Sequence, residues 1–444
     1  MRNSTLAPLV AATIAVTACH LDLTNPNAPT EKEVFGTREG IIALTVGLQA
    51  RYAAGMMDFI FPGGLVTDEL GATQAALASY KDVESGAPMV NTFDAVELPW
   101  RSHFRTVKTA NDLLVHAPDL QVALGDSTLS GIIAISYLFK AMALGEMIQQ
   151  YKEIPIDTYN DPAPAFVNRT TALTYVLALL DSAIIQFRAV PPGSEFNTTI
   201  RAGAPGVPGL DLRNTIFAMM ARYQRIAGNP GAARDAADSV ALAVISNMPF
   251  SDQAINPIHD LSNRSGYVKP VDSLRLQAES ADARIAYLVK DTTIAGNAQP
   301  LDRFVQYASN GAAIPIYLRG EVMLIRAEAL LDLADLPGAR TAVNAVRTKC
   351  GGAADQPKAC LPALADTLLD TDPEIRAEIY RQRRFELFAT GLRWEDARRQ
   401  GLVGVGSLAH RCWLLYPQSE RNVNLNVPAD PEPAASPAFP ATCF

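Results

Sequence analysis

The chain has 444 residues, of which 48% are hydrophobic, and it carries a formal net charge of −8 at pH 7. A chain of this length can bury a large core and has room for more than one domain. Its acidic balance, which becomes −9 when residues 1–18 and their single charge Arg2 are set aside, argues against nucleic acid and anionic membrane surfaces as partners.

The first 18 residues have the pattern of a bacterial export signal. Arg2 supplies the positive start, residues 6–16 the apolar segment, and residues 16–18 (Val-Thr-Ala) the small-residue processing site. Cys19 follows directly and resembles the lipobox cysteine, which is acylated and becomes the new N-terminus. A cysteine here does nothing for ordinary cleavage, so we favour this interpretation over a simple signal peptide. We predict a lipid on Cys19 and a tether over residues 19–31, so that the mature chain is anchored to a membrane without spanning it.

Residues 32–444 are predicted to form one mostly α-helical domain. Apolar residues recur at helical spacing in segments near 101–150, 171–246, 317–349 and 373–400. Within them, two helix–turn–helix units share a Pro-Gly-Ala turn and a length of roughly 34 residues, as in tetratricopeptide repeats. In the first unit the second helix is expected to run over residues 232–246. We therefore predict repeat-like helix pairs in one compact domain with long irregular loops, and not a long solenoid.

Two segments, residues 61–98 and 250–314, differ from the helical pattern. They are rich in Gly, Asn, Ser, Pro and Asp, with scattered aromatic residues. Loops of this length in a compact protein are usually functional. Both are predicted to be ligand-loop regions.

Four cysteines remain after Cys19, and an even number in an exported chain indicates disulfides. Of three possible pairings we expect Cys350–Cys360, closing a Gly/Ala/Pro loop, and Cys412–Cys443, holding the C-terminal tail. A zinc site is disfavoured because the spacings are wrong and only His410 lies near any of these four cysteines.

The sequence has no recognisable catalytic motif: there is no Gly-x-Ser-x-Gly, phosphate loop or His-Glu-x-x-His. The adjacent acids Asp68-Glu69 and Glu395-Asp396 could in principle serve a glycoside hydrolase, but adjacent acids are far more often surface charge. We expect no enzymatic activity, no metal and no cofactor.

Residues 375–401 form a dense Arg/Glu segment that predicts an amphipathic helix ending near Gly391. Its arginines at 381, 383 and 384 could suggest an anion site. Glu378 and Glu386 lie among them at helical spacing, which favours ion pairs within the helix.

This segment and several others resemble the SusD/RagB family of outer-membrane nutrient-uptake lipoproteins. The resemblance spans nearly the whole mature chain and depends on the order of its motifs. These motifs are Trp100 with Thr109-Ala110-Asn111, Tyr137 to Pro155, Tyr317 to Ala329 with Val343 to Arg347, Arg384-Phe385-Glu386-Leu387, Gly391 with Arg393-Trp394 and Asp396, and Tyr416 to Glu420.

The resemblance implies a non-enzymatic, lipid-anchored protein on the outer membrane, facing the cell exterior. It would capture oligosaccharides, or peptides, and deliver them to a TonB-dependent β-barrel transporter. The motif residues, including Trp100 and Trp394, would belong to the scaffold, and the loops would hold the ligand. The candidate ligand residues are the aromatics Tyr80, Phe93, Tyr267 and Tyr307 with the polar Asp68 and Arg303, although for each one packing on the scaffold is favoured over ligand contact.

Two other functions fit parts of the sequence. A lipid-anchored helical-repeat scaffold that binds only proteins would share the anchor and the helices, but it would not need long aromatic loops. A secreted glycoside hydrolase would need carboxylates facing each other across a cleft, and no spacing here suggests them.

Overall fold

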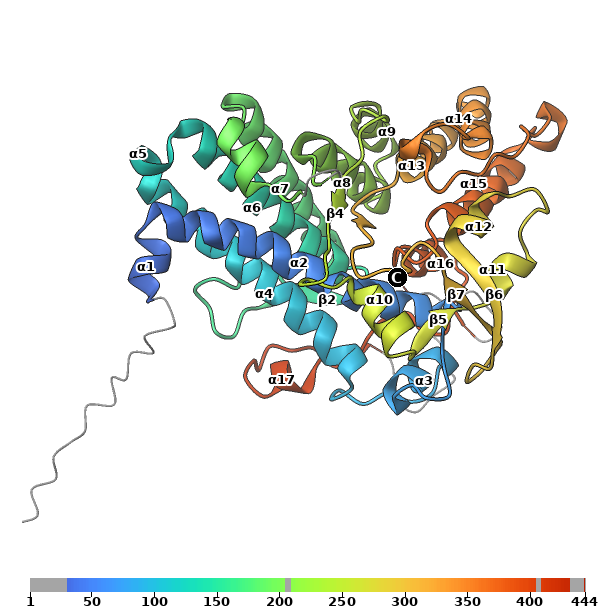
Figure 1. The fold of residues 1–444 in the computed structure, drawn as a ribbon, viewed down its shortest axis with the longest axis horizontal. Coiled ribbons are helices and arrows are strands. Elements are labelled where there is room, and N and C mark those ends of the chain that lie inside the picture. Colours follow the sequence, from blue (N-terminus) through green and yellow to red (C-terminus); the bar gives the residue numbers. More distant parts are fainter. Residues whose placement is uncertain (1–29, 204–208, 405–408, 432–442, 444) are drawn as a thin grey trace, which may run out of the picture.

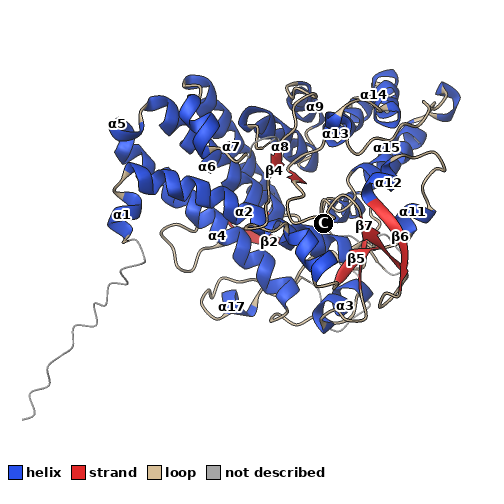
Figure 2. Ribbon diagram, in the orientation of Figure 1, coloured by secondary structure: helices blue, strands red, loops and turns tan. Residues whose placement is uncertain are grey.

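The computed structural model describes residues 30–203, 209–404, 409–431 and 443, and this part of the chain is mostly helical (Figures 1 and 2). The predicted fold class is confirmed. The expected signal peptide, Cys19 and all of the tether before Thr30 lie outside the described residues.

The helices and strands alternate irregularly along the chain. The helices of the first half are α1 (Glu31–Phe35), α2 (Arg38–Val66), α3 (Ala78–Ser85), α4 (Asp94–His116), α5 (Gln121–Leu124), α6 (Asp126–Met147), α7 (Arg169–Ala189), α8 (Leu212–Ile226) and α9 (Pro230–Asp238). Those of the second half are α10 (Pro257–His259), α11 (Ser273–Leu276), α12 (Arg284–Leu288), α13 (Arg319–Asp332), α14 (Leu336–Thr348), α15 (Asp372–Glu386), α16 (Arg393–Arg399) and α17 (Gln418–Arg421). The strands are β1 (Leu70–Ala72), β2 (Glu153–Pro155), β3 (Phe166–Asn168), β4 (Asn247–Met248), β5 (Val268–Pro270), β6 (Val289–Ile294), β7 (Leu301–Phe304) and β8 (Ile314–Pro315).

Helix α6 is the centre of the N-terminal half, where it packs against α4 and α7 (Figure 1). Its apolar residues surround the helix, and nearly all of them are buried, as expected for a helix covered on more than one side. At Gly145 an added Cβ would overlap the ring of Tyr223 on α8, so glycine permits this close approach. By length and hydropathy α6 and α7 could each cross a membrane, but 83% of the most apolar window of α6 is buried inside the protein.

The two expected helix–turn–helix units are the pairs α8–α9 and α13–α14. Helix α13 packs against α8, α9 and α15, so the second pair continues the helical layer begun by the first (Figure 1). Each second helix has proline in its first turn, where the missing N–H costs no helical hydrogen bond.

Helix α9 is shorter than predicted, because it ends at Asp238 and not near residue 246. The backbone N–H of Ala241 donates to Oδ1 of Asn214 on α8 (2.8 Å), and the Ser246 hydroxyl bonds that of Thr215 (2.6 Å). These bonds hold the segment after α9 out of the helix and lead it into β4, which pairs with β8. The partners lie on another helix, so helical periodicity cannot indicate them.

The prediction that residues 61–98 form a long loop is wrong for most of that range. Helix α2 continues to Val66 through Pro62, and α3 and the start of α4 occupy much of the remainder. Proline cannot donate to the carbonyl of Asp58, one turn earlier, but the Gln150 side chain does so instead (2.8 Å). This long-range substitute donor lets the helix continue past its proline.

Residues 250–314 are irregular, as predicted, with short helices and antiparallel two-stranded ribbons. Strand β5 pairs with β1 from the other loop region, and β6 pairs with β7. Figure 2 shows these ribbons gathered beside α3, α11 and α12. The two regions predicted to hold ligand therefore adjoin each other.

The expected cysteine pairs are both present as disulfides. Cys350 and Cys360 have Cα atoms 4.8 Å apart, and Cys412 and Cys443 have Cα atoms 5.4 Å apart. The first closes the loop after α14, and the second attaches the chain terminus to the segment after α16.

The Arg/Glu segment forms two helices, α15 and α16, joined by a turn at Gly391. Gly391 has φ of +82°, and a Cβ there would lie 2.7 Å from the ring of Phe59. The expectation of ion pairs within α15 is wrong for the arginines at 381–384. Glu378 pairs with Arg347 on α14, and Glu386 pairs with Lys349 after it.

A buried ion network connects α8, α13, α15 and α16. Arg225 contacts both Glu328 (3.1 Å) and Asp396 (3.4 Å), and Nε of Arg383 donates to Asp396 (2.7 Å). Arg399 also pairs with Glu328. Burial raises the pKa of the Glu328 carboxyl, although Arg225 and Arg383 counteract the rise. Because these charges are buried, losing the partner of any one of them would destabilise the fold.

Substitution Glu328→Gln should therefore lower the free energy of unfolding by about 3–5 kcal/mol, because it leaves buried guanidinium groups without a full counter-charge. Arg326→Met is the control on the same helix: its ion pair with Asp238 is exposed, and it should cost less than about 1 kcal/mol. Urea unfolding of both variants measures the difference. Equal losses would contradict the structural role of the network.

Candidate functional site

A cavity of about 300 Å³ lies where the second ligand-loop region meets the helical layer. We call it the tyrosine cavity after Tyr287, Tyr307 and Tyr317. It is enclosed by the segment before β4, helix α12, the chain after β7, the start of α13, the disulfide loop and the end of α15. Besides the tyrosines its main lining residues are Asn247, Gln306, Pro315, Arg319, Gln356, Pro357, Glu386, Phe388 and Thr390.

The three tyrosines differ in exposure. Tyr287 on α12 is 37% exposed, whereas Tyr307 and Tyr317 are 2% and 5% exposed. Tyr307 packs edge-on against Phe304, with ring centroids 5.5 Å apart, and its carbonyl accepts from His259 and Asn263. Burial raises the phenol pKa of all three tyrosines. They therefore stay neutral, and Tyr287 offers the accessible ring.

Two hydrogen-bond donors at the cavity have no acceptor among the described residues. Within the described chain, Nε2 of Gln306 and Nε of Arg319 are buried atoms without a hydrogen-bond partner. Arg319 is held through another nitrogen, which pairs with Asp355 of the disulfide loop. A buried donor without a partner is costly, so a ligand oxygen that accepts from it would bind favourably.

The walls of the cavity are supported from behind by buried charges. Arg284 on α12 pairs with Asp282 (2.6 Å) and approaches Glu386 (3.7 Å), which also pairs with Lys349 (2.9 Å). Burial raises the pKa of Glu386 despite these two cations. Because α12 and α15 are joined in this way, the position of Tyr287 is fixed relative to the rest of the cavity.

The structure separates the six predicted ligand residues. Tyr307 lines the tyrosine cavity, but its ring is buried. Tyr80 on α3 is 8% exposed, α3 packs against β1, and Tyr267 directly precedes β5, so both residues lie beside the β1–β5 ribbon. Phe93 and Tyr267 are partly buried and pack against the core. Arg303 is exposed on β7, away from any ion pair in the described part of the chain.

Asp68 takes part in a polar contact between chain segments. It has φ of +54°, accepts from Gln299 (3.1 Å), and is bonded by the ring of His410 (3.1 Å). The contact joins the end of α2 to the segment before Cys412. The role of Asp68 in this structure is thus a link between loops.

The adjacent acids considered for catalysis lie in separate surroundings. Asp68 faces His410, whereas Glu69 is buried in a different cavity, near Arg384 and Arg393. Glu395 pairs with Arg169 and Arg398, and Asp396 belongs to the buried network. Neither pair presents two carboxylates to one cleft.

The sequence analysis missed Tyr287, Gln306 and Arg319 as cavity residues. Tyr287 and Gln306 lie in the predicted loop region, which was the available signal, but nothing local distinguishes them from neighbouring residues. Tyr317 and Arg319 belong to a motif assigned to the scaffold, and only the folded chain shows that this motif also borders a cavity.

Comparison with known families and structures gives a consistent result. Residues 300–425 match the model of the SusD family, which confirms the resemblance found in the sequence. No curated protein matches the chain.

Several solved structures share the fold over most of their length. A SusD superfamily protein of Bacteroides fragilis superposes with a TM-score of 0.69 at 15% identity, covering 89% of this chain and 99% of the other. A Bacteroides vulgatus structure, whose name proposes sugar binding, gives 0.64 at 15% identity, covering 88% and 98%. B. fragilis NanU gives 0.67 at 12% identity, covering 91% and 98%. At these identities the likeness establishes the fold alone.

The His410–Asp68 contact predicts a pH-dependent contribution to stability. The hydrogen bond from His410 to Asp68 raises the pKa of His410 above its ordinary value of 6.5. Burial opposes this rise, and the negative charges of Asp68 and Glu84 add to it. The contribution should therefore be fully present below about pH 6.5 and lost as pH rises through the folded value. His410→Gln should lower the melting temperature at about pH 5.5 and much less at about pH 8.5. A loss that is the same at both pH values would contradict the contact.

Proposed function

We propose that the chain is a nutrient-binding protein of the SusD family, which captures oligosaccharides and delivers them to a TonB-dependent outer-membrane transporter; the match of residues 300–425 and the shared fold support this. The observation that carries the binding part of this proposal is the tyrosine cavity.

The chemistry of the cavity suits a sugar. The apolar face of a pyranose ring stacks on an aromatic ring, and its hydroxyls need fixed hydrogen-bond partners. Tyr287 offers the accessible ring, and Gln306 and Arg319 offer donors at the same cavity. The proposed sugar-binding name of the B. vulgatus structure supports the same ligand class.

The proposed location follows from the sequence. The Val-Thr-Ala-Cys site would place a lipid on Cys19, and the tether that follows would hold the domain at the membrane surface. In the family this arrangement faces the cell exterior, above a β-barrel transporter. Substrate would pass from the binding protein into the barrel.

Binding without reaction is favoured by the state of the carboxylates. Among the described residues that line the tyrosine cavity, Glu386 is the one acid, and it pairs with Lys349. A hydrolase would need two carboxyl groups about 5–10 Å apart, facing a bound glycosidic bond. The supporting evidence therefore favours capture over hydrolysis.

Substitution Tyr287→Ala should weaken oligosaccharide binding about tenfold, since it removes the accessible stacking surface. Tyr159→Ala is the matched control, because Tyr159 is also 37% exposed but lies in the segment between β2 and β3. A neutral-glycan microarray, followed by calorimetry with the strongest glycan, measures both variants.

Two outcomes would contradict the proposal. Equal affinities of wild type and Tyr287→Ala would remove the cavity as the sugar site. Hydrolysis of the bound glycan during incubation would contradict a binding role.

A further inference from the structure

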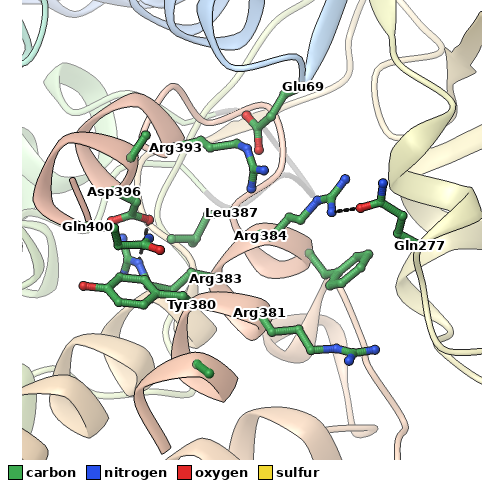
Figure 3. Close-up of a pocket in the computed structure, with 13 residues that line it drawn as sticks. Glu69, Gln277, Tyr380, Arg381, Arg383, Arg384, Leu387, Arg393, Asp396 and Gln400 are labelled. Atoms are coloured by element: carbon green, nitrogen blue, oxygen red, sulfur yellow. Dashed lines mark hydrogen bonds and ion pairs between the residues drawn. The ribbon is translucent and has the colours of Figure 1, made fainter. Parts of the chain in front are cut away.

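A second cavity, of about 350 Å³, lies between α15, α16 and the chain at Glu69 and Gln277 (Figure 3). We call it the arginine cavity after the four arginines that line it: Arg381, Arg383, Arg384 and Arg393. Of the acids in the described part of the chain, Glu69 and Asp396 line it as well. The lining therefore has an excess of positive charge, although the whole chain is acidic.

The most buried of these arginines has free donors in the cavity. Arg383 is 2% exposed, and its Nε donates to Asp396 (2.7 Å). Among the described residues, neither Nη1 nor Nη2 of Arg383 has a hydrogen-bond partner, and Nε of Arg393 has none either. Buried guanidinium donors are rarely left unsatisfied, so these groups indicate a missing acceptor.

The acids of the cavity do not supply that acceptor. Asp396 already receives Arg383 and Arg225. Glu69 is 5% exposed, and no described residue makes a hydrogen bond of normal geometry to either of its oxygens, although the Ala389 backbone is near enough to affect its pKa. Figure 3 shows Glu69 above Arg393 and Arg384, on the opposite side of the cavity from Arg383.

The charges of the cavity are poorly balanced without a ligand. Burial, followed by repulsion from Arg393, lowers the pKa of Arg384 to about 10. Burial also raises the pKa of Glu69 to about 7, against the attraction of Arg393 and Arg384 and with repulsion from Asp396. Near neutral pH part of the Glu69 population is therefore protonated, and the cavity then becomes more positive.

We propose that the arginine cavity binds the carboxylate of a sugar acid, with Arg383 and Arg393 donating to its oxygens. Guanidinium groups suit carboxylates because their parallel N–H donors match the two oxygens. The neutral groups Gln277, Gln400 and Tyr380 lie around the same cavity and would serve the hydroxyls of the sugar ring. The volume suits one sugar residue and not a long chain.

This inference rests on the proposed function for the sugar part of the ligand, while the oxyanion part rests on the arginines alone. The resemblance implied that the motif residues of α15 and α16 belong to the scaffold, whereas this inference gives these helices a contact with ligand. The tyrosine cavity would hold neutral sugar, and the arginine cavity would add selectivity for acidic residues.

Calorimetry with D-glucuronate, D-glucose and inorganic phosphate tests the inference on the full mature chain. Wild type should bind glucuronate, and Arg393→Gln should weaken that binding about tenfold or more, because it removes a charge-assisted donor. Arg376→Met is the matched control: this arginine is also on α15, pairs with Asp372 and Asp332, and does not line the cavity. It should leave glucuronate affinity unchanged.

Glu69→Gln gives a second readout that does not depend on losing a contact. In wild type, glucuronate affinity should fall between about pH 6 and pH 8 as Glu69 ionises, and the variant should bind tightly across this range. Arg384, Arg393 and Asp396 are the charged groups that face Glu69, and the variant keeps them all.

The inference would be overturned by absent glucuronate binding, by equal affinities of wild type and Arg393→Gln, or by phosphate binding alone. Retained binding of neutral glycans that depends on Tyr287 would show that the proposed function survives such a failure. Loss of neutral-glycan binding as well would overturn both.

Discussion

The ion network formed by Arg225, Glu328, Asp396 and Arg383 is the constraint on which the rest of the structure depends. It joins four helices that are far apart in sequence, and its members are 1–7% exposed. Because an isolated buried charge costs several kcal/mol, the network tolerates few alternative arrangements of these helices. It thereby holds α15 and α16 against the repeat-like helix pairs α8–α9 and α13–α14.

Fixing α15 also fixes both cavities, since each is built on part of that helix. The end of α15 and the turn after it supply Glu386, Phe388 and Thr390 to the tyrosine cavity. The preceding turns supply Arg381, Arg383 and Arg384 to the arginine cavity. The loops complete the two sites from outside. A rigid helical scaffold with sites completed by variable loops can change its ligand without changing its fold.

Much of this architecture could be predicted from the sequence, because its signals are local. Apolar spacing indicated the helix pairs, and the turn at Gly391 followed from its position after an amphipathic run. The features that could not be predicted depend on hydrogen-bond partners far away in the sequence. Gln150 lets α2 pass through Pro62, and Asn214 draws the chain out of α9. The same limit applies to the sites: Tyr307 was chosen as a loop aromatic but packs on Phe304, whereas the accessible Tyr287 lies on α12, which Arg284 links to Glu386 on α15.

The central proposal is that this protein is the binding subunit of an outer-membrane importer, and isolation of its native complex tests it most directly. The full-length chain would be purified from detergent-solubilised outer membranes under mild conditions and its partners identified by mass spectrometry, with Cys19→Ser as the unlipidated control. The account predicts that the wild-type chain co-elutes with a large TonB-dependent β-barrel and carries a lipid on Cys19. A wild-type chain recovered as a lipid-free monomer, with no barrel, would contradict it.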